Sequence, residues 1–174
     1  EFGYWKISVE RPLRLKVEIN KERIESFRQV AEEVKDITAY NLMSDLYSKI
    51  NEDVYYNYNE FEKNLKKLAK TKGEKLTAKR LKLIRDFFTT KDENAERVVN
   101  KVFKKEKEDA LNGKFELGND VVEFESDKEL SDTEQIPLTY EDGIEKFFKD
   151  EVLPYAPDAW IDSNKTQIGY EISF

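Results

Sequence analysis

The sequence predicts a mainly α-helical α+β fold, with a body of about five to six helices, short strands at both chain ends and a small hairpin near residues 115–125. Apolar residues alternate with polar ones near the amino terminus and repeat at helical spacing over the middle of the chain, while only six Gly and four Pro occur. We expect one compact domain overall. It would comprise a strand segment (1–19), a charged helical body (20–112) and an acidic part with the hairpin, a last helix and an irregular tail (113–174).

Strands are predicted at the amino terminus. Trp5, Ile7 and Val9 alternate with polar residues, and the same pattern returns over residues 13–19. Pro12 has no amide hydrogen to donate, so it should interrupt the ladder between the two stretches.

Apolar residues at helical spacing predict five helices between residues 20 and 112. Asn20 and Thr77 precede two of them and can accept hydrogen bonds from the first turn as N-caps. The fifth helix is expected to turn Val98, Val99, Val102 and Phe103 inward. The expected starts, in chain order, are Asn20, Thr38, Phe61, Thr77 and Asp92.

The carboxy-terminal part should be less regular. Gly113 is expected to end the fifth helix, and apolar residues on both sides of Gly118 indicate the hairpin. Residues 126–135 are acidic and typical of a loop. A last helix should begin near Thr139, in a pattern similar to a capping box, and stop at Pro154. The tail is expected to be irregular and to end in a short strand at Tyr170, Ile172 and Phe174.

The composition excludes several kinds of chemistry. There is no Cys and no His, so the chain offers no thiolate, no imidazole base and no zinc site of the usual kind. No two glycines have GxG spacing and no two prolines are adjacent, so the Gly-rich cofactor turn and the Pro-Pro-aromatic loop of DNA adenine methylases are both absent. We therefore predict no catalytic, cofactor-binding or metal-binding residue in these residues.

The same sequence bears on location. No apolar run approaches the length of a membrane span, and the absence of Cys suits a reducing compartment, so we expect a cytoplasmic protein without a membrane partner. The sequence starts at Glu1 rather than at a methionine, and an excised fragment is the simple explanation.

Charge is distributed unevenly. The net charge of −7 argues against a dedicated DNA-coating module, yet ten basic residues and one acid lie from Lys63 to Arg85, and thirteen acids and three lysines lie from Glu116 to Glu151. The basic stretch is the best candidate for contacts with DNA phosphates, and a solvated helix face is the alternative. The expected contacts are Lys66, Lys67, Lys70, Lys79, Arg80 and Lys82.

Two groups of aromatic residues have a functional and a structural interpretation. Tyr55, Tyr56 and Tyr58 could stack on bases, but neighbouring acids and asparagines favour a turn packed on the core. Trp160 is favoured as an anchor for the tail, with an exposed interface as the alternative.

Two parts of the sequence resemble the modification (M) subunits of type I restriction-modification systems, which are N6-adenine DNA methyltransferases. The first, FGYWKISVERPLRL at residues 2–15, resembles the segment that follows the catalytic core. The second resembles the distal region of the same subunits, in the same order, whereas residues 20–129 carry no signature. It consists of LSDTEQIPL (130–138), EVLP (151–154), PDAWID (157–162) and KTQIGYEI (165–172).

This resemblance implies a parent subunit that transfers a methyl group from S-adenosylmethionine to adenine N6, with the cofactor bound in a catalytic domain outside these residues. It also implies a specificity subunit, a restriction subunit and double-stranded DNA as partners. No catalytic residue of the family is carried over, because no position matches its motifs. We expect the chain alone to be inactive and to serve assembly with the specificity subunit and DNA. A non-sequence-specific duplex clamp through helices within 61–88 is the alternative, and an unrelated helical enzyme domain is a weaker third hypothesis.

Overall fold

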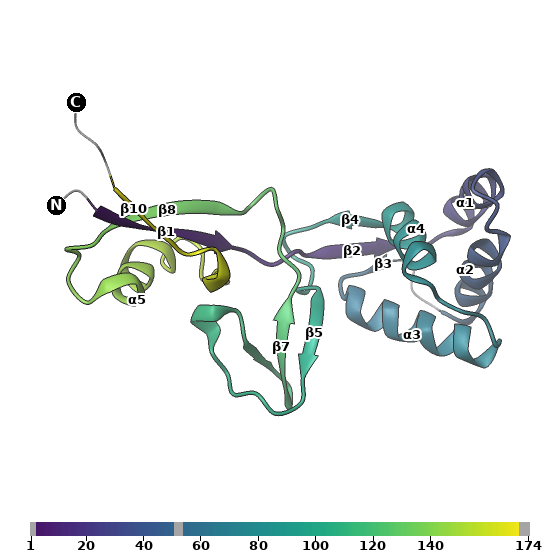
Figure 1. Ribbon diagram of the computed structural model, residues 1–174. Helices are drawn as coiled ribbons and strands as arrows, with labels where there is room; N and C mark the ends of the chain where they lie inside the picture. Colours follow the sequence, from purple (N-terminus) through teal and green to yellow (C-terminus); the bar gives the residue numbers. More distant parts are fainter. Residues whose placement is uncertain (1–2, 51–53, 171–174) are drawn as a thin grey trace. The chain divides into compact units, whose positions relative to one another are not determined.

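The computed structural model describes residues 3–50 and 54–170 (Figure 1). The chain forms two compact units. We call residues 1–13 and 99–174 the sheet unit, and residues 14–98 the helical unit.

The fold is α+β, but its strands are not limited to the chain ends, and the prediction of a mainly helical fold with terminal strands is wrong. Three antiparallel sheets are distributed along the described residues, one in the helical unit and two in the sheet unit. Most strands that the sequence failed to indicate are short, and they are held by partners distant in the chain rather than by an alternating pattern of their own.

Local capping signals correctly place the first and fourth helices of the helical unit. The Asn20 side chain accepts a hydrogen bond from the amide of Arg23 at 2.8 Å, and the Thr77 hydroxyl accepts one from the amide of Arg80 at 3.1 Å. The second helix begins one residue earlier than predicted, because Asp36 is its N-cap. The helices are α1 (Lys21–Glu33), α2 (Ile37–Lys49), α3 (Tyr58–Thr71) and α4 (Ala78–Phe88).

A small sheet completes this unit. β2 (Leu15–Glu18) lies between β3 (Val54–Tyr55) and β4 (Thr89–Lys91), and the apolar stripes of the helices form a core with its inward residues. The rings of Phe27 and Phe88 have centroids 4.9 Å apart at its centre. Burial of each such large apolar side chain stabilises the folded state by about 1.5–3 kcal/mol. The larger buried residues include Leu15, Val17, Ile19, Ile24, Phe27, Leu42, Met43, Leu46, Phe61, Leu65, Ile84 and Phe88.

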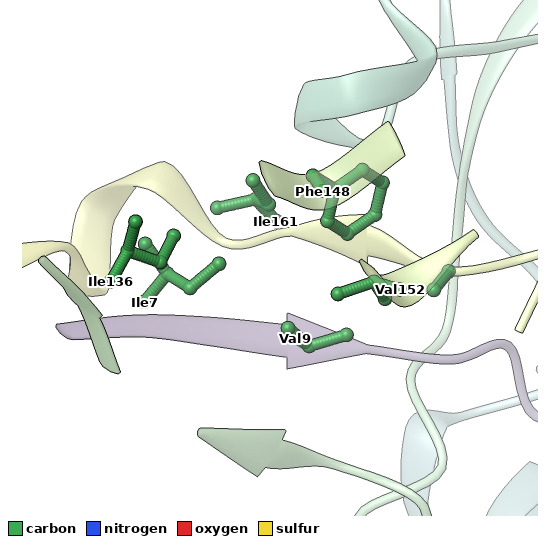
Figure 2. Packing of buried hydrophobic residues seen from close by; sticks show 7 residues of the cluster. Ile7, Val9, Ile136, Phe148, Val152 and Ile161 are labelled. Atoms are coloured by element: carbon green, nitrogen blue, oxygen red, sulfur yellow. The ribbon is translucent and has the colours of Figure 1, made fainter. Parts of the chain in front are cut away.

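The principal sheet of the sheet unit is built around β1 (Gly3–Glu10), the first predicted strand. It pairs with β10 (Gln167–Tyr170) on one side and β8 (Asp132–Pro137) on the other, and β9 (Trp160–Ile161) pairs with its end. Figure 2 shows side chains from these strands gathered with those of the following helix into one core. That core consists of Ile7, Val9, Ile136, Phe148, Val152, Ala159 and Ile161.

The last helix is present, but its start is not where the capping pattern placed it. α5 (Gly143–Phe147) continues into a π-helical turn over Phe148–Val152, which buries Phe148 and Val152 as the apolar stripe predicts. The N-cap is Asp142, which has a φ of 65° and makes no capping hydrogen bond through its side chain, so the predicted start near Thr139 is wrong.

The helix predicted from Asp92 is absent, and its apolar residues from Val99 to Phe103 form β5 (Val99–Phe103) instead. β5 pairs antiparallel with β7 (Asp120–Phe124), whose other edge pairs with β6 (Phe115–Leu117). β6 and β7 confirm the hairpin predicted near residues 115–125. The pairing of β5 is irregular between Val99 and Lys101, so its apolar residues do not alternate strictly along the sequence.

Two segments expected to be irregular are partly ordered as strands. The acidic segment 126–135 contains the first residues of β8, and residues 51–59, expected to form a loop, contain β3 and the start of α3. Residues 51–53 lie outside the described residues, as do Ile172 and Phe174 of the predicted terminal strand. Tyr170, the one described residue of that predicted strand, is the last residue of β10, so β9 and most of β10 lie in the part of the tail that was wrongly expected to be irregular.

Candidate nucleic-acid interface

The lysines predicted on the third helix share its outer face. Buried residues at Phe61, Leu65 and Leu68 mark the inner stripe of α3. Lys63, Lys66, Lys67 and Lys70 are all exposed and stand at positions i, i+3, i+4 and i+7, which lie on one side of a helix. We call these four residues the α3 lysine face. Lys63 was not among the predicted contacts, although its spacing from Lys66 and Lys67 could have identified it.

Most of the positive charge on this face is uncompensated by protein groups. Lys66 lies 3.6 Å from a carboxylate oxygen of Glu62, but its side chain is 60% exposed and such a pair contributes little. In the parts of the chain that the structure describes, no ion pair involves Lys63, Lys67 or Lys70. Like charges at i, i+4 repel by about 0.2–0.5 kcal/mol, so an anion bound along the face would be stabilised by relieving that repulsion.

The predicted contacts on α4 fall into two kinds. Lys79 and Lys82 are exposed, and Lys82 pairs with Asp86 at 2.6 Å across one helical turn. Arg80 has a side chain only 18% exposed, and its Nε donates to both carboxylate oxygens of Asp36, at 2.9 and 3.1 Å. Its guanidinium also donates to the carbonyl oxygen of Lys75. Arg80 therefore links α4 to the N-cap of α2, whereas the lysines remain accessible.

Trp160 lies in the second core of the sheet unit and is 6% exposed. Its ring packs edge-on to Phe115, with centroids 5.9 Å apart, and it contacts Gly113 so closely that a Cβ there would stand 2.8 Å from Trp160 Cδ1. This packing is what an anchor of the tail requires, and it leaves little indole surface for a partner.

The three tyrosines do not form a shared exposed surface. Tyr58 is 1% exposed and packs against Phe61 with ring centroids 5.9 Å apart, Tyr55 is half-buried in β3, and Tyr56 is half exposed. Tyr58 thus belongs to the core of the helical unit, as the structural interpretation predicted.

Across residues 3–50 and 54–170, no three acidic side chains come together in a way that could hold a metal ion. No helix in the described part of the chain has both the length and the apolar character needed to cross a membrane.

Comparison of the chain with models of protein families, with curated proteins and with solved structures gave no match. The resemblance to type I modification subunits therefore stays a proposal.

Proposed function

We propose that this chain is the non-catalytic carboxy-terminal region of a type I modification subunit, where it serves assembly with the specificity subunit and DNA. One observation carries the proposal: four of the five segments that resemble the family form strands of one sheet, in which β1 pairs with each of the other three. Residues 2–15 supply β1, residues 130–138 supply β8, and the later segments supply β9 and β10. Segments that lie far apart in the sequence are thus neighbours in one sheet.

The strand register places individual residues of these segments directly opposite one another. Trp5 of β1 stands opposite Ile136 of β8 on one side and opposite Ile168 of β10 on the other. Ile136 is fully buried in the core that this sheet covers.

The parent would have its activity elsewhere. In the proposed assignment, S-adenosylmethionine and the flipped adenine are bound by a catalytic domain outside residues 1–174, and this region positions that domain in a cytoplasmic complex with the specificity and restriction subunits. The test is to examine the residues encoded immediately before Glu1 for a Gly-rich cofactor turn and a Pro-Pro-aromatic loop. Their absence from the intact protein would contradict the assignment.

The assembly role can be tested by removing the helical unit from the intact subunit. Leu13 donates its amide hydrogen to the carbonyl oxygen of Glu125 at 2.7 Å, and Val99 pairs with Phe124, so a short linker can join residues 13 and 99. A matched variant, Ile136→Asp, places a charge in the core of the sheet unit. The role is contradicted if both changes leave complex formation and methylation unaltered.

A second candidate function is a duplex clamp without sequence specificity, which the α3 lysine face favours. Exposed lysines on every turn can replace the counterions that surround DNA phosphates. Lysine supplies charge without the planar pair of donors by which arginine reads guanine, so this face should bind the backbone and not the bases.

The clamp is tested with residues 1–174 and a duplex at several salt concentrations. Changing Lys63, Lys67 and Lys70 to Gln should lower the slope of log affinity against log salt by about one unit for each lysine. The matched control changes the exposed Lys104, Lys105 and Lys107 of the sheet unit to Gln. No binding in dilute buffer, or an equal effect of the control, would overturn the clamp.

A further inference from the structure

A groove of about 420 Å³ lies between the turn that joins α1 to α2 and the first two turns of α4. This volume is within the range of sites that take small ligands. The groove is distinct from the α3 lysine face, since no residue of α3 lines it. The lining residues are Val34, Lys35, Asp36, Thr77, Lys79, Arg80, Lys82, Leu83 and Asp86.

The groove has an excess of positive charge. Four of its lining residues are cationic and two are carboxylates. Arg80 pairs with Asp36 at 2.9 Å, and Lys82 pairs with Asp86 at 2.6 Å, so both carboxylates are already engaged. Across residues 3–50 and 54–170, neither Lys35 nor Lys79 forms an ion pair. Two lysines of the lining therefore have no ion-pair partner among the described residues.

The backbone at Lys35 provides an independent observation. Lys35 has a φ of 58°, and its neighbour Asp36 donates to the carbonyl oxygen of Ala31 at 2.8 Å, which is the hydrogen bond of a Schellman motif. Glycine is the residue that this left-handed position favours, since a Cβ is unfavourable there. The turn thus fixes the backbone of Lys35 at the edge of α1, where Lys35 lines the groove.

The start of α4 adds to the attraction for an anion. Thr77 caps an 11-residue helix whose first turn contains no acidic residue of its own, and the carboxylate nearest to that turn, Asp36, is bound to Arg80. Val34 and Leu83 supply apolar contact beside the charged groups.

We propose that this groove binds a phosphate-bearing ligand, with the ammonium groups of Lys35 and Lys79 contacting the phosphate and Val34 and Leu83 contacting the moiety attached to it. The inference goes beyond the proposed function and does not depend on the family assignment. It joins Lys79 of the basic stretch to Lys35, a residue outside it. A phosphodiester of nucleic acid and a free phosphorylated ligand offer the same chemistry, and the experiment separates them.

The test follows the backbone amide signals of Lys35, Thr77 and Lys79 in residues 1–174 by NMR, during separate titrations with pyrophosphate and with a short DNA duplex. Saturable shifts are expected, with a dissociation constant of about 1 mM for pyrophosphate if that probe binds. Saturation by pyrophosphate supports a free phosphate ligand, and saturation by the duplex alone supports a phosphodiester. Either result supports the site.

Two variants and one control make the test specific. Lys35→Gly and Lys79→Gln should each weaken binding about tenfold, because each removes a charge-assisted hydrogen bond. Lys35→Gly removes the side chain at a backbone position that suits glycine, so loss of folding does not confound it. The control, Lys105→Gln, removes the same charge from an exposed site of the sheet unit, outside both the groove and the α3 lysine face, and should change affinity less than about twofold. The proposal is overturned if neither probe shifts these amides saturably, or if the control weakens binding as much as Lys35→Gly.

Discussion

Arg14 pairs with Arg97 in an isolated antiparallel bridge, so the two ends of the helical unit lie next to each other. The Arg14 guanidinium donates to the carbonyl oxygen of Ala95 at 2.9 Å, and the Asn59 side chain donates to the carbonyl oxygen of Arg97 at 2.7 Å. Contacts within the unit therefore hold together the two segments by which the chain enters and leaves it.

Residues 14–98 should therefore fold without the rest of the chain. The unit has its own buried core, and domains of about this size bury enough surface to be stable alone. We expect a helical circular dichroism spectrum, a cooperative thermal transition and dispersed NMR signals from this segment expressed by itself. Poorly dispersed NMR signals together with the absence of a cooperative thermal transition would show that the unit depends on residues outside it.

Replacing Lys35 by glycine should raise the free energy of unfolding by about 1 kcal/mol, because the left-handed backbone at this position is unfavourable for a residue with a Cβ. Lys35→Ala keeps the Cβ and serves as the control, for which no such gain is expected. Urea unfolding of the three proteins measures the difference. Equal stability of Lys35→Gly and Lys35→Ala would contradict the backbone argument and remove one support for the phosphate groove.

Replacing Gly113 by alanine should destabilise the sheet unit by about 2 kcal/mol. A Cβ there would meet the Trp160 ring at 2.8 Å, and the φ of 86° is unfavourable for any residue with a Cβ. Gly118→Ala is the matched control, since Gly118 also has a positive φ but its Cβ would enter open space, and it should cost about 1 kcal/mol. Denaturant unfolding followed by tryptophan fluorescence compares the two, and similar losses would show that the Trp160 contact is unimportant.

Glu18 should contribute to the pH dependence of stability. Its carboxylate accepts a hydrogen bond from Lys16, with Nζ 2.9 Å from Oε1, and this bond and the attraction between the charges lower the pKa of Glu18. A group whose pKa is lower in the folded state stabilises the fold above its unfolded pKa, and this stabilisation is lost as the pH falls through the folded pKa. Glu18→Gln should therefore lose less stability than the unaltered chain on acidification.

The direct check is an NMR titration of the Glu18 carboxyl group. In Lys16→Met the pKa of Glu18 should rise toward its ordinary value, because the donor and the positive charge are both gone. An unchanged titration curve would assign the lowered pKa to a cause other than Lys16.

Features decided by neighbouring residues could be predicted from the sequence. Asn20 and Thr77 cap their helices as expected, because a cap involves residues only three positions apart. The α3 lysine face was largely foreseen for the same reason, since its spacing is that of one helix. The place of Lys35 in a groove could not be predicted, because only the backbone angle and the packing of α4 reveal it.

Features decided by distant partners were missed. Val98, Val99 and Val102 gave a spacing that resembles a helical stripe, but an irregular register conceals the alternation of β5, and β7 is the partner that makes it a strand. In β8 only Ile136 is buried, so its pairing with β1 left almost no apolar pattern to find. Arg80 was predicted to contact DNA, and its ion pair with Asp36, 44 positions away, is visible only in three dimensions.

The proposal that this region is a scaffold for a methyltransferase is tested most directly by measuring N6-methyladenine formation and S-adenosylmethionine binding. The intact protein, together with its specificity subunit, should methylate duplex DNA, and residues 1–174 alone should neither transfer a methyl group nor bind the cofactor. Tight cofactor binding by residues 1–174, or an intact protein that never methylates adenine, would contradict the account.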